Sequence, residues 1–141
     1  MSGEQILEEL GLLVRHVTLL SGSLDELPSL TVTQRLALAV IADDAPLRLA
    51  DLAARLGVTP PTASRAVEAL VELALVTRVP DPLDRRALRL ELTPEGRRQL
   101  DERRARAAAT FAPAARRLDP REREQLVSLL GRLRAALEQP G

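Results

Sequence analysis

Two adjacent arginines stand at the tip of a predicted β-hairpin, within the stretch PDPLDRRA. A guanidinium group donates hydrogen bonds in a fixed fork, which suits phosphate oxygens and the acceptor atoms in a DNA groove. We expect Arg86 to enter a minor groove and Arg85 to contact phosphate or Asp84. Asp84 is expected to hold an arginine extended by a charge-assisted bond. For both arginines the alternative is a solvated charge on the hairpin.

A second group of polar residues lies at the start of the helix that precedes this hairpin. Thr59 followed by Pro60 is typical of a helix N-terminus, because the hydroxyl caps a backbone amide and proline lacks one. Apolar residues form one face of this helix and leave the other face free at its N-terminal end, where a DNA-reading helix contacts bases. The candidates for such contacts are Pro61, Thr62, Ser64 and Arg65. Ser64 could instead bond to the local backbone.

Few other residues could do chemistry. The chain has no cysteine or tyrosine, one histidine and no glycine-rich phosphate loop, and no nucleophile stands at catalytic spacing from a base. We therefore expect neither an enzyme nor a metal or cofactor site. His16, beside an apolar stripe, could line an effector cavity or titrate with pH, and the alternative is a partly exposed structural histidine.

Helices and one hairpin must position these residues. Helical spacing of apolar residues, with capping and proline signals, predicts six helices over 5–24, 30–41, 49–56, 59–74, 93 to about 113, and from 119 onward. Gly57 fits the left-handed position that ends a helix, and Pro113 should bend or end the fifth helix. Paired strands are expected over 75–79 and 88–92. The predicted fold is mainly α with a small β-hairpin wing, a winged helix-turn-helix.

Composition limits what such a domain can bind. The 141 residues are 45% hydrophobic, which is enough for one compact domain. The single aromatic residue, Phe111, excludes the base stacking that single-strand binders use. The net charge is zero, yet residues 1–47 carry two arginines against seven acidic residues, whereas residues 99–141 carry nine against six. This modest asymmetry partly offsets the argument that a neutral chain avoids nucleic acid.

Two apolar helix stripes near the chain ends have no obvious partner. They are too apolar to remain in water, so the sequence predicts a homodimer held by its ends. The stripe residues are Ile6, Leu10, Leu13 and Val17 in the first helix, and Leu126, Leu130, Leu133 and Leu137 in the last.

The stretch from about residue 30 to 96 resembles the MarR family of bacterial transcriptional regulators. The resemblance rests on DLAARLGV, TASRAVEALVELALV and DPLDRRALRLELTPEG. It implies a DNA-binding region over 30–96 and a helical dimerisation region over 1–29 and 97–141. It also implies two recognition helices on a pseudo-palindromic duplex, a repressor, and an effector, if there is one, between the winged region and the dimerisation helices.

Two positions depart from the family pattern. Ala74 stands where a glycine is usual, so either a residue with a Cβ takes the left-handed conformation, at about 1 kcal/mol, or the turn changes. Arg48 stands where a serine or threonine usually caps the first helix of the motif, which leaves Asp51 to favour the helix dipole.

A rival hypothesis is a winged-helix module that docks on protein, because a fold alone does not specify function. Adjacent tip arginines favour DNA, since protein docking does not need them. The N-terminus lacks the pattern of a signal peptide and no apolar run reaches the roughly 20 residues of a membrane span. We therefore expect a cytoplasmic protein with no membrane partner.

Overall fold

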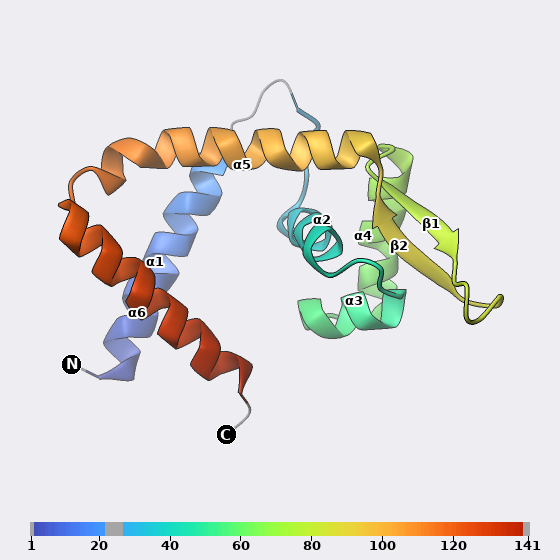
Figure 1. Cartoon of the computed structure of the whole chain (residues 1–141), viewed down its shortest axis with the longest axis horizontal. Helices are drawn as coiled ribbons and strands as arrows, with labels where there is room; N and C mark the ends of the chain where they lie inside the picture. The colour runs from blue at the N-terminus through green and yellow to red at the C-terminus, as the bar shows by residue number, and fades with distance from the viewer. Residues whose placement is uncertain (1, 22–26, 140–141) are drawn as a thin grey trace.

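A computed structural model describes residues 2–21 and 27–139. It is mainly α with one antiparallel hairpin, as the sequence predicts, and Figure 1 shows a winged end and a helical end joined by one long helix. The elements in chain order are α1 (Gly3–Ser21), α2 (Val32–Asp44), α3 (Leu49–Leu56), α4 (Pro60–Glu72), β1 (Val76–Pro80), β2 (Leu88–Leu92), α5 (Pro94–Ala115) and α6 (Pro120–Glu138). The predicted continuation of the first helix over 22–24 lies outside the described residues.

Side-chain caps set the starts of four helices. Thr31, Thr59, Thr93 and Asp119 each accept a hydrogen bond from a backbone amide in the first helical turn, as expected for these residue types. Proline occupies the first position after three of these caps, where its missing amide costs nothing. The predicted bounds of the first strand are each wrong by one residue, because it runs over 76–80 instead of 75–79.

The hydrophobic core lies between α2, α3, α4 and the hairpin. Its largest fully buried side chains belong to all of these elements and are Leu38, Ile41, Leu52, Val67, Leu70, Leu75 and Val76. Strand β2 lies antiparallel to β1, with Val76 opposite Leu92. Leu47, just before α3, adds a single bridge to Leu90 on the other edge of β2, where the Leu90 amide donates to the Leu47 carbonyl over 2.8 Å. The hairpin, called the wing below, is therefore attached to the core at its base.

The turn between α4 and β1 is hydrogen-bonded to the residue that precedes α5. Ala74 has a φ of 60°, so the left-handed conformation expected from the sequence is present despite its Cβ. Its carbonyl accepts the Thr93 hydroxyl over 2.6 Å, and the Leu75 carbonyl accepts the Thr93 amide over 3.0 Å. A Cβ at Gly96 would stand 2.0 Å from the Leu75 carbonyl oxygen, so only glycine fits there. We call this contact set the joint.

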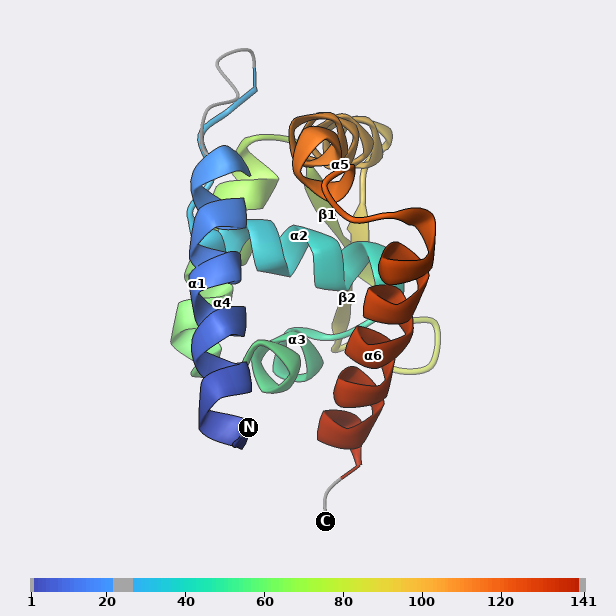
Figure 2. The same cartoon turned by 90° about the vertical axis from the view of Figure 1, so that its left-hand side faces the viewer.

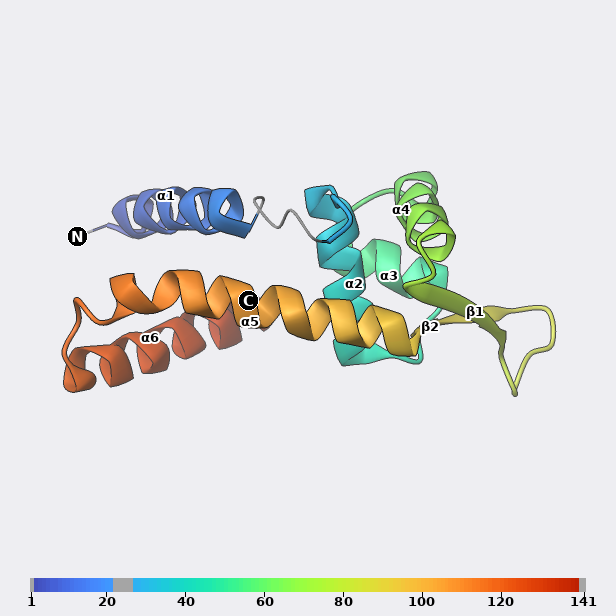
Figure 3. The same ribbon diagram turned by 90° about the horizontal axis from the view of Figure 1, so that it is seen from above.

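The helical end consists of α1, α6 and the far half of α5. In Figures 1 and 3, α5 runs from the base of the wing to the opposite end of the molecule, with α1 beside its far half and α6 folded back below it. Pro113 lies inside α5, which ends two residues later at Ala115, in agreement with the expected effect of proline. No helix in the described ranges is both long enough and apolar enough to cross a membrane.

The Ala74→Gly variant should raise the free energy of unfolding by about 0.5–1 kcal/mol, because it removes a left-handed Cβ at an exposed site. Thermal unfolding followed by circular dichroism measures this. The matched control Ala69→Gly, inside α4, should lower stability by about 0.5–1 kcal/mol instead. A stability loss for both variants would contradict the strain assigned to the turn.

Candidate nucleic-acid interface

The N-terminus of α4 presents capped amides and short polar side chains. The Thr59 hydroxyl lies 2.9 Å from the Thr62 hydroxyl and accepts the Thr62 amide over 3.4 Å. Pro61 and Arg65 are exposed, while Thr62 and Ser64 are half-buried. Ala63, Ala66, Val67 and Leu70 face the core, so the remaining face of the helix is the one left open. All four predicted DNA-contact residues of this helix therefore lie at its accessible N-terminal end.

Arg65 is already extended along the helix toward its N-terminus. Its Nε donates to the carbonyl of Pro61 over 3.4 Å, a long and weak bond that leaves the other guanidinium donors for a ligand. The dipole of a helix makes its N-terminal turn favourable for anions. The guanidinium of Arg65 and the positive end of the helix dipole thus meet at one surface.

The wing tip carries the two predicted arginines, both exposed. Neither Arg85 nor Arg86 forms an ion pair within the described parts of the chain. The prediction for Asp84 was wrong in its bonding partner: its Oδ1 accepts the backbone amide of Arg86 over 3.0 Å and orders the tip backbone instead of a guanidinium. A carboxylate two residues before an amide forms this turn locally, and that competes with a side-chain bond.

Sequence analysis missed the ion pair at the base of the wing. Arg48 donates from Nε over 3.1 Å and from Nη2 over 2.9 Å to Oδ2 of Asp81, which is buried. The other carboxylate oxygen accepts the Leu83 amide over 2.9 Å. The Leu83 amide first, and then Arg48, hold the pKa of Asp81 below its ordinary value. The two residues are far apart in the sequence, so only a predicted contact between the two segments could have found them.

The wing and α4 lie together at the end of the molecule farthest from α1 and α6 (Figures 1 and 3). Strand β1 follows α4 directly through the joint and packs against it. The interface candidates of the helix and of the hairpin therefore belong to one rigid end. The spacing between them is set by the core and not by a flexible linker.

A cavity of about 270 Å³ lies between α1, α2 and α5, where the helical end meets the winged end. Arg35 and Arg103 line it together with Val17, Leu36, Leu100 and other mainly apolar groups. The Nε of Arg103 is buried without a hydrogen bond among the described residues. Burial first, and then the nearby charge of Arg35, lowers the pKa of Arg103. Sequence patterns do not predict that Arg35 and Arg103 lie together, because they belong to two different helices, α2 and α5.

His16 does not line this cavity, although Val17 and Thr18 do. It is exposed, and its Nδ1 lies 2.8 Å from the carbonyl of Leu12 in the preceding turn of α1. His16 therefore makes a local hydrogen bond within α1 and lies outside this cavity.

The two predicted apolar stripes face one groove. Figure 2 shows α1 and α6 standing on opposite sides of the helical end, and a groove of about 930 Å³ runs between them. Its apolar lining includes Ile6, Leu10 and Leu13 of the first predicted stripe and Leu126, Leu130 and Leu133 of the last, together with Leu129 and Ala136. Two stripe residues lie outside it, Val17 in the cavity described above and Leu137, which is 87% exposed. No residue of α6 is buried in the single chain.

Comparisons with known proteins agree with this geometry. The fold is that of winged-helix regulators, and the model of the MarR family matches residues 29–87. RV1404 from Mycobacterium tuberculosis is 30% identical over 100% of this chain and 97% of its own, with a TM-score of 0.82. The chain belongs to the MarR family, whose members are transcriptional regulators.

Two further solved structures extend the likeness. The transcriptional regulator Tm0710 from Thermotoga maritima is 26% identical, covers 96% of this chain and 93% of its own, and has a TM-score of 0.70. A MarR transcriptional regulator from Methanosarcina mazei, at 24% identity, shares the fold with a TM-score of 0.79 over 96% of this chain and 98% of its own. A comparison with curated protein sequences gives no match. Within residues 2–21 and 27–139, no cluster of acidic or histidine side chains could hold a metal ion.

Removal of the Arg86 side chain should weaken binding to a specific duplex by about 1–3 kcal/mol, since its exposed guanidinium is free to enter a groove. Fluorescence anisotropy at near-physiological salt measures the loss for Arg86→Ala. Arg116→Ala removes the same charge at the far end of α5 and should change affinity little. Equal losses for the two variants would mean that only net charge matters, which contradicts a specific wing contact.

Proposed function

We propose that the protein is a homodimeric, sequence-specific DNA-binding regulator that acts as a repressor on a pseudo-palindromic site. The observation that carries this is the pairing, at one end of the fold, of the free N-terminal face of α4 with unpaired arginines at the wing tip. On such a surface, α4 would read the major groove and Arg86 the adjacent minor groove. Thr62 and Arg65 would contact bases, while Arg85 would contact phosphate.

The rival function, docking on protein without specific DNA binding, has less support. Cores of protein interfaces are depleted of charge, whereas this surface offers exposed arginines and a helix N-terminus. Those groups match the phosphates and base-edge acceptors of duplex DNA.

Dimerisation through α1 and α6 accounts for their uncovered apolar faces. A nanomolar dimer needs about 12 kcal/mol, to which association adds a cost of about 4–15 kcal/mol. At about 25 cal/mol per Å², that requires roughly 600–1,100 Å² of buried apolar surface. Each chain has a groove between α1 and α6, lined mainly by leucines. In a dimer, helices of one chain would fill the groove of the other and bury apolar surface of the required size. The two α4 helices would then bind half-sites about 10 bp apart.

Leu130→Glu combined with Leu133→Glu should convert the dimer to monomers that lose tight binding to a palindromic duplex, because the charges would enter the apolar groove. Sedimentation velocity at micromolar concentration measures the oligomeric state. Val127→Glu, on the same helix but 72% exposed and outside the groove, is the matched control and should remain dimeric. A wild-type monomer that still binds a palindrome tightly would refute the dimeric architecture.

An effector of this regulator would occupy the cavity between α1, α2 and α5. The cavity is mostly apolar but contains Arg35 and Arg103, and the buried Nε of Arg103 has a free donor. Such a lining suits a small organic anion with an apolar body, which would fill the space and pair with the guanidinium groups. Because both α2 and α5 line the cavity, an occupant would act on the angle between the two ends of the molecule.

Benzoate should therefore raise the melting temperature and weaken DNA binding, while neutral benzamide, of nearly the same shape, should do neither. Arg103→Gln removes the charge and should abolish the benzoate effect. Thermal shift and anisotropy with each ligand make the comparison. Equal responses to benzoate and benzamide would exclude a charge-selective site.

A further inference from the structure

The base of the wing is held to the segment before α3 by two attachments. One is the backbone bond from the Leu90 amide to the Leu47 carbonyl, 2.8 Å long. The other is the ion pair between Arg48 and Asp81, in which two guanidinium nitrogens bond the same carboxylate oxygen. The first lies on strand β2 and the second at the residue where β1 ends and the tip begins. Together they attach both strands of the wing to one short segment.

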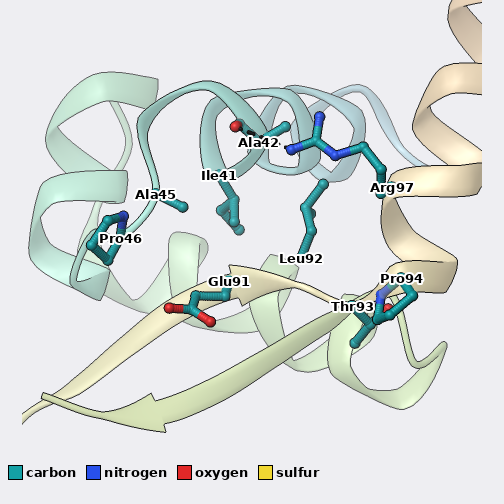
Figure 4. A pocket seen from close by; sticks show the side chains of 9 residues that line it. All are labelled: Ile41, Ala42, Ala45, Pro46, Glu91, Leu92, Thr93, Pro94 and Arg97. Carbon is teal, nitrogen blue, oxygen red and sulfur yellow. Dashed lines mark hydrogen bonds between the residues drawn. The ribbon is translucent and has the colours of Figure 1, made fainter.

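A hollow lies beside these attachments. Figure 4 shows Ala45 and Pro46 on one side of an open cavity of about 350 Å³, with Glu91 and Thr93 on the other. Leu47 and Leu90 pack in the core, so the base of β2 is held by packing as well as by its hydrogen bond. Asp81, at the outer end of β1, is attached to the segment before α3 through the Arg48 pair.

Asp81 connects this attachment to the tip. Its side chain is only 9% exposed, and its second oxygen accepts the Leu83 amide, while its own amide donates to the Ala87 carbonyl over 3.0 Å. One carboxylate thus bonds both the segment before α3 and the backbone that leads to the tip arginines. A change at Arg48 reaches the tip through this one group.

Arg48 occupies the N-cap position of α3 but makes no side-chain capping hydrogen bond there. It is the N-cap residue of α3, with φ −88° and ψ 163°, a site at which serine, threonine or aspartate would stabilise the helix. The carboxylate of Asp51 accepts the Arg48 amide over 3.1 Å and compensates in part. The side chain of Arg48 therefore bonds Asp81 at the base of the wing and does not cap α3.

We propose that Arg48 is a positioning residue for DNA binding, which braces the wing through Asp81 so that the tip arginines meet the minor groove at a fixed angle. The inference rests on the proposed DNA-binding function but adds a residue with no DNA contact of its own. A competing role is a direct contact from Arg48 to phosphate, since its side chain is 47% exposed. The two roles predict opposite effects of changing Asp81: the brace needs Asp81, whereas a phosphate contact would be strengthened by freeing Arg48.

The test compares Arg48→Ser, Asp81→Asn and the double variant, each with and without Arg86→Ala. Serine is a good N-cap, so Arg48→Ser should regain through the helix cap part of the stability that it loses with the ion pair to buried Asp81. It should nevertheless weaken binding to the duplex that the wild-type protein selects from a random pool by about tenfold. Asp81→Asn and the double variant should lose about as much, because both break the same brace. In the Arg86→Ala background none of the three should matter further.

Hydrogen exchange of the Leu83 amide, measured without DNA, tests the brace independently of function. Exchange should be faster in both single variants than in wild type. If the wild-type protein selects no duplex, the proposed function fails while this measurement still decides the brace. Unchanged Leu83 exchange would overturn the proposal. So would tighter DNA binding by Asp81→Asn together with a salt dependence flattened by about one log–log unit in Arg48→Ser, the pattern of a phosphate contact.

Discussion

The close backbone contact between Gly96 and Leu75 fixes the rest of the architecture. A glycine at that position lets the first turn of α5 lie against Leu75, three residues beyond the end of α4, where no Cβ would fit. Thr93 then bonds both Ala74 and Leu75, so the end of α4, the end of β2 and the start of α5 share one set of hydrogen bonds. The left-handed Ala74 is tolerated because these bonds hold it.

Because of the joint, the start of α5 is tied to the turn between α4 and β1, so these elements would move together. The helix has 22 residues and is about 33 Å long, and it connects the end proposed to bind DNA to the helices proposed to dimerise. A small rotation at the helical end would therefore displace α4 and the wing together. An effector bound in the cavity lined by α2 and α5 would therefore alter DNA affinity through the orientation of α5. The Arg48–Asp81 pair would matter for the same reason, because a wing that is not held to α3 would not move together with α4.

Local chemistry made much of the fold predictable. Threonine followed by proline marks the starts of α4 and α5, and Gly57 takes the left-handed conformation expected after α3. The exposed arginines of the tip were found for the same reason, since a hairpin tip is local. What the sequence could not give depends on distant segments: Asp81 needs Arg48, and the cavity needs Arg35 beside Arg103. Asp84 was misassigned because a backbone amide competes with the arginine side chains for its carboxylate.

We propose that α4 reads sequence in two symmetric half-sites. Selection of bound duplexes from a random pool, done in parallel for wild type, Thr62→Ala and Arg65→Ala, is the decisive experiment. We expect the wild-type motif to be an inverted repeat with half-sites about one helical turn apart, and both variants to select altered bases inside the half-sites. The same motif for all three proteins, or no enrichment by the wild type, would contradict it.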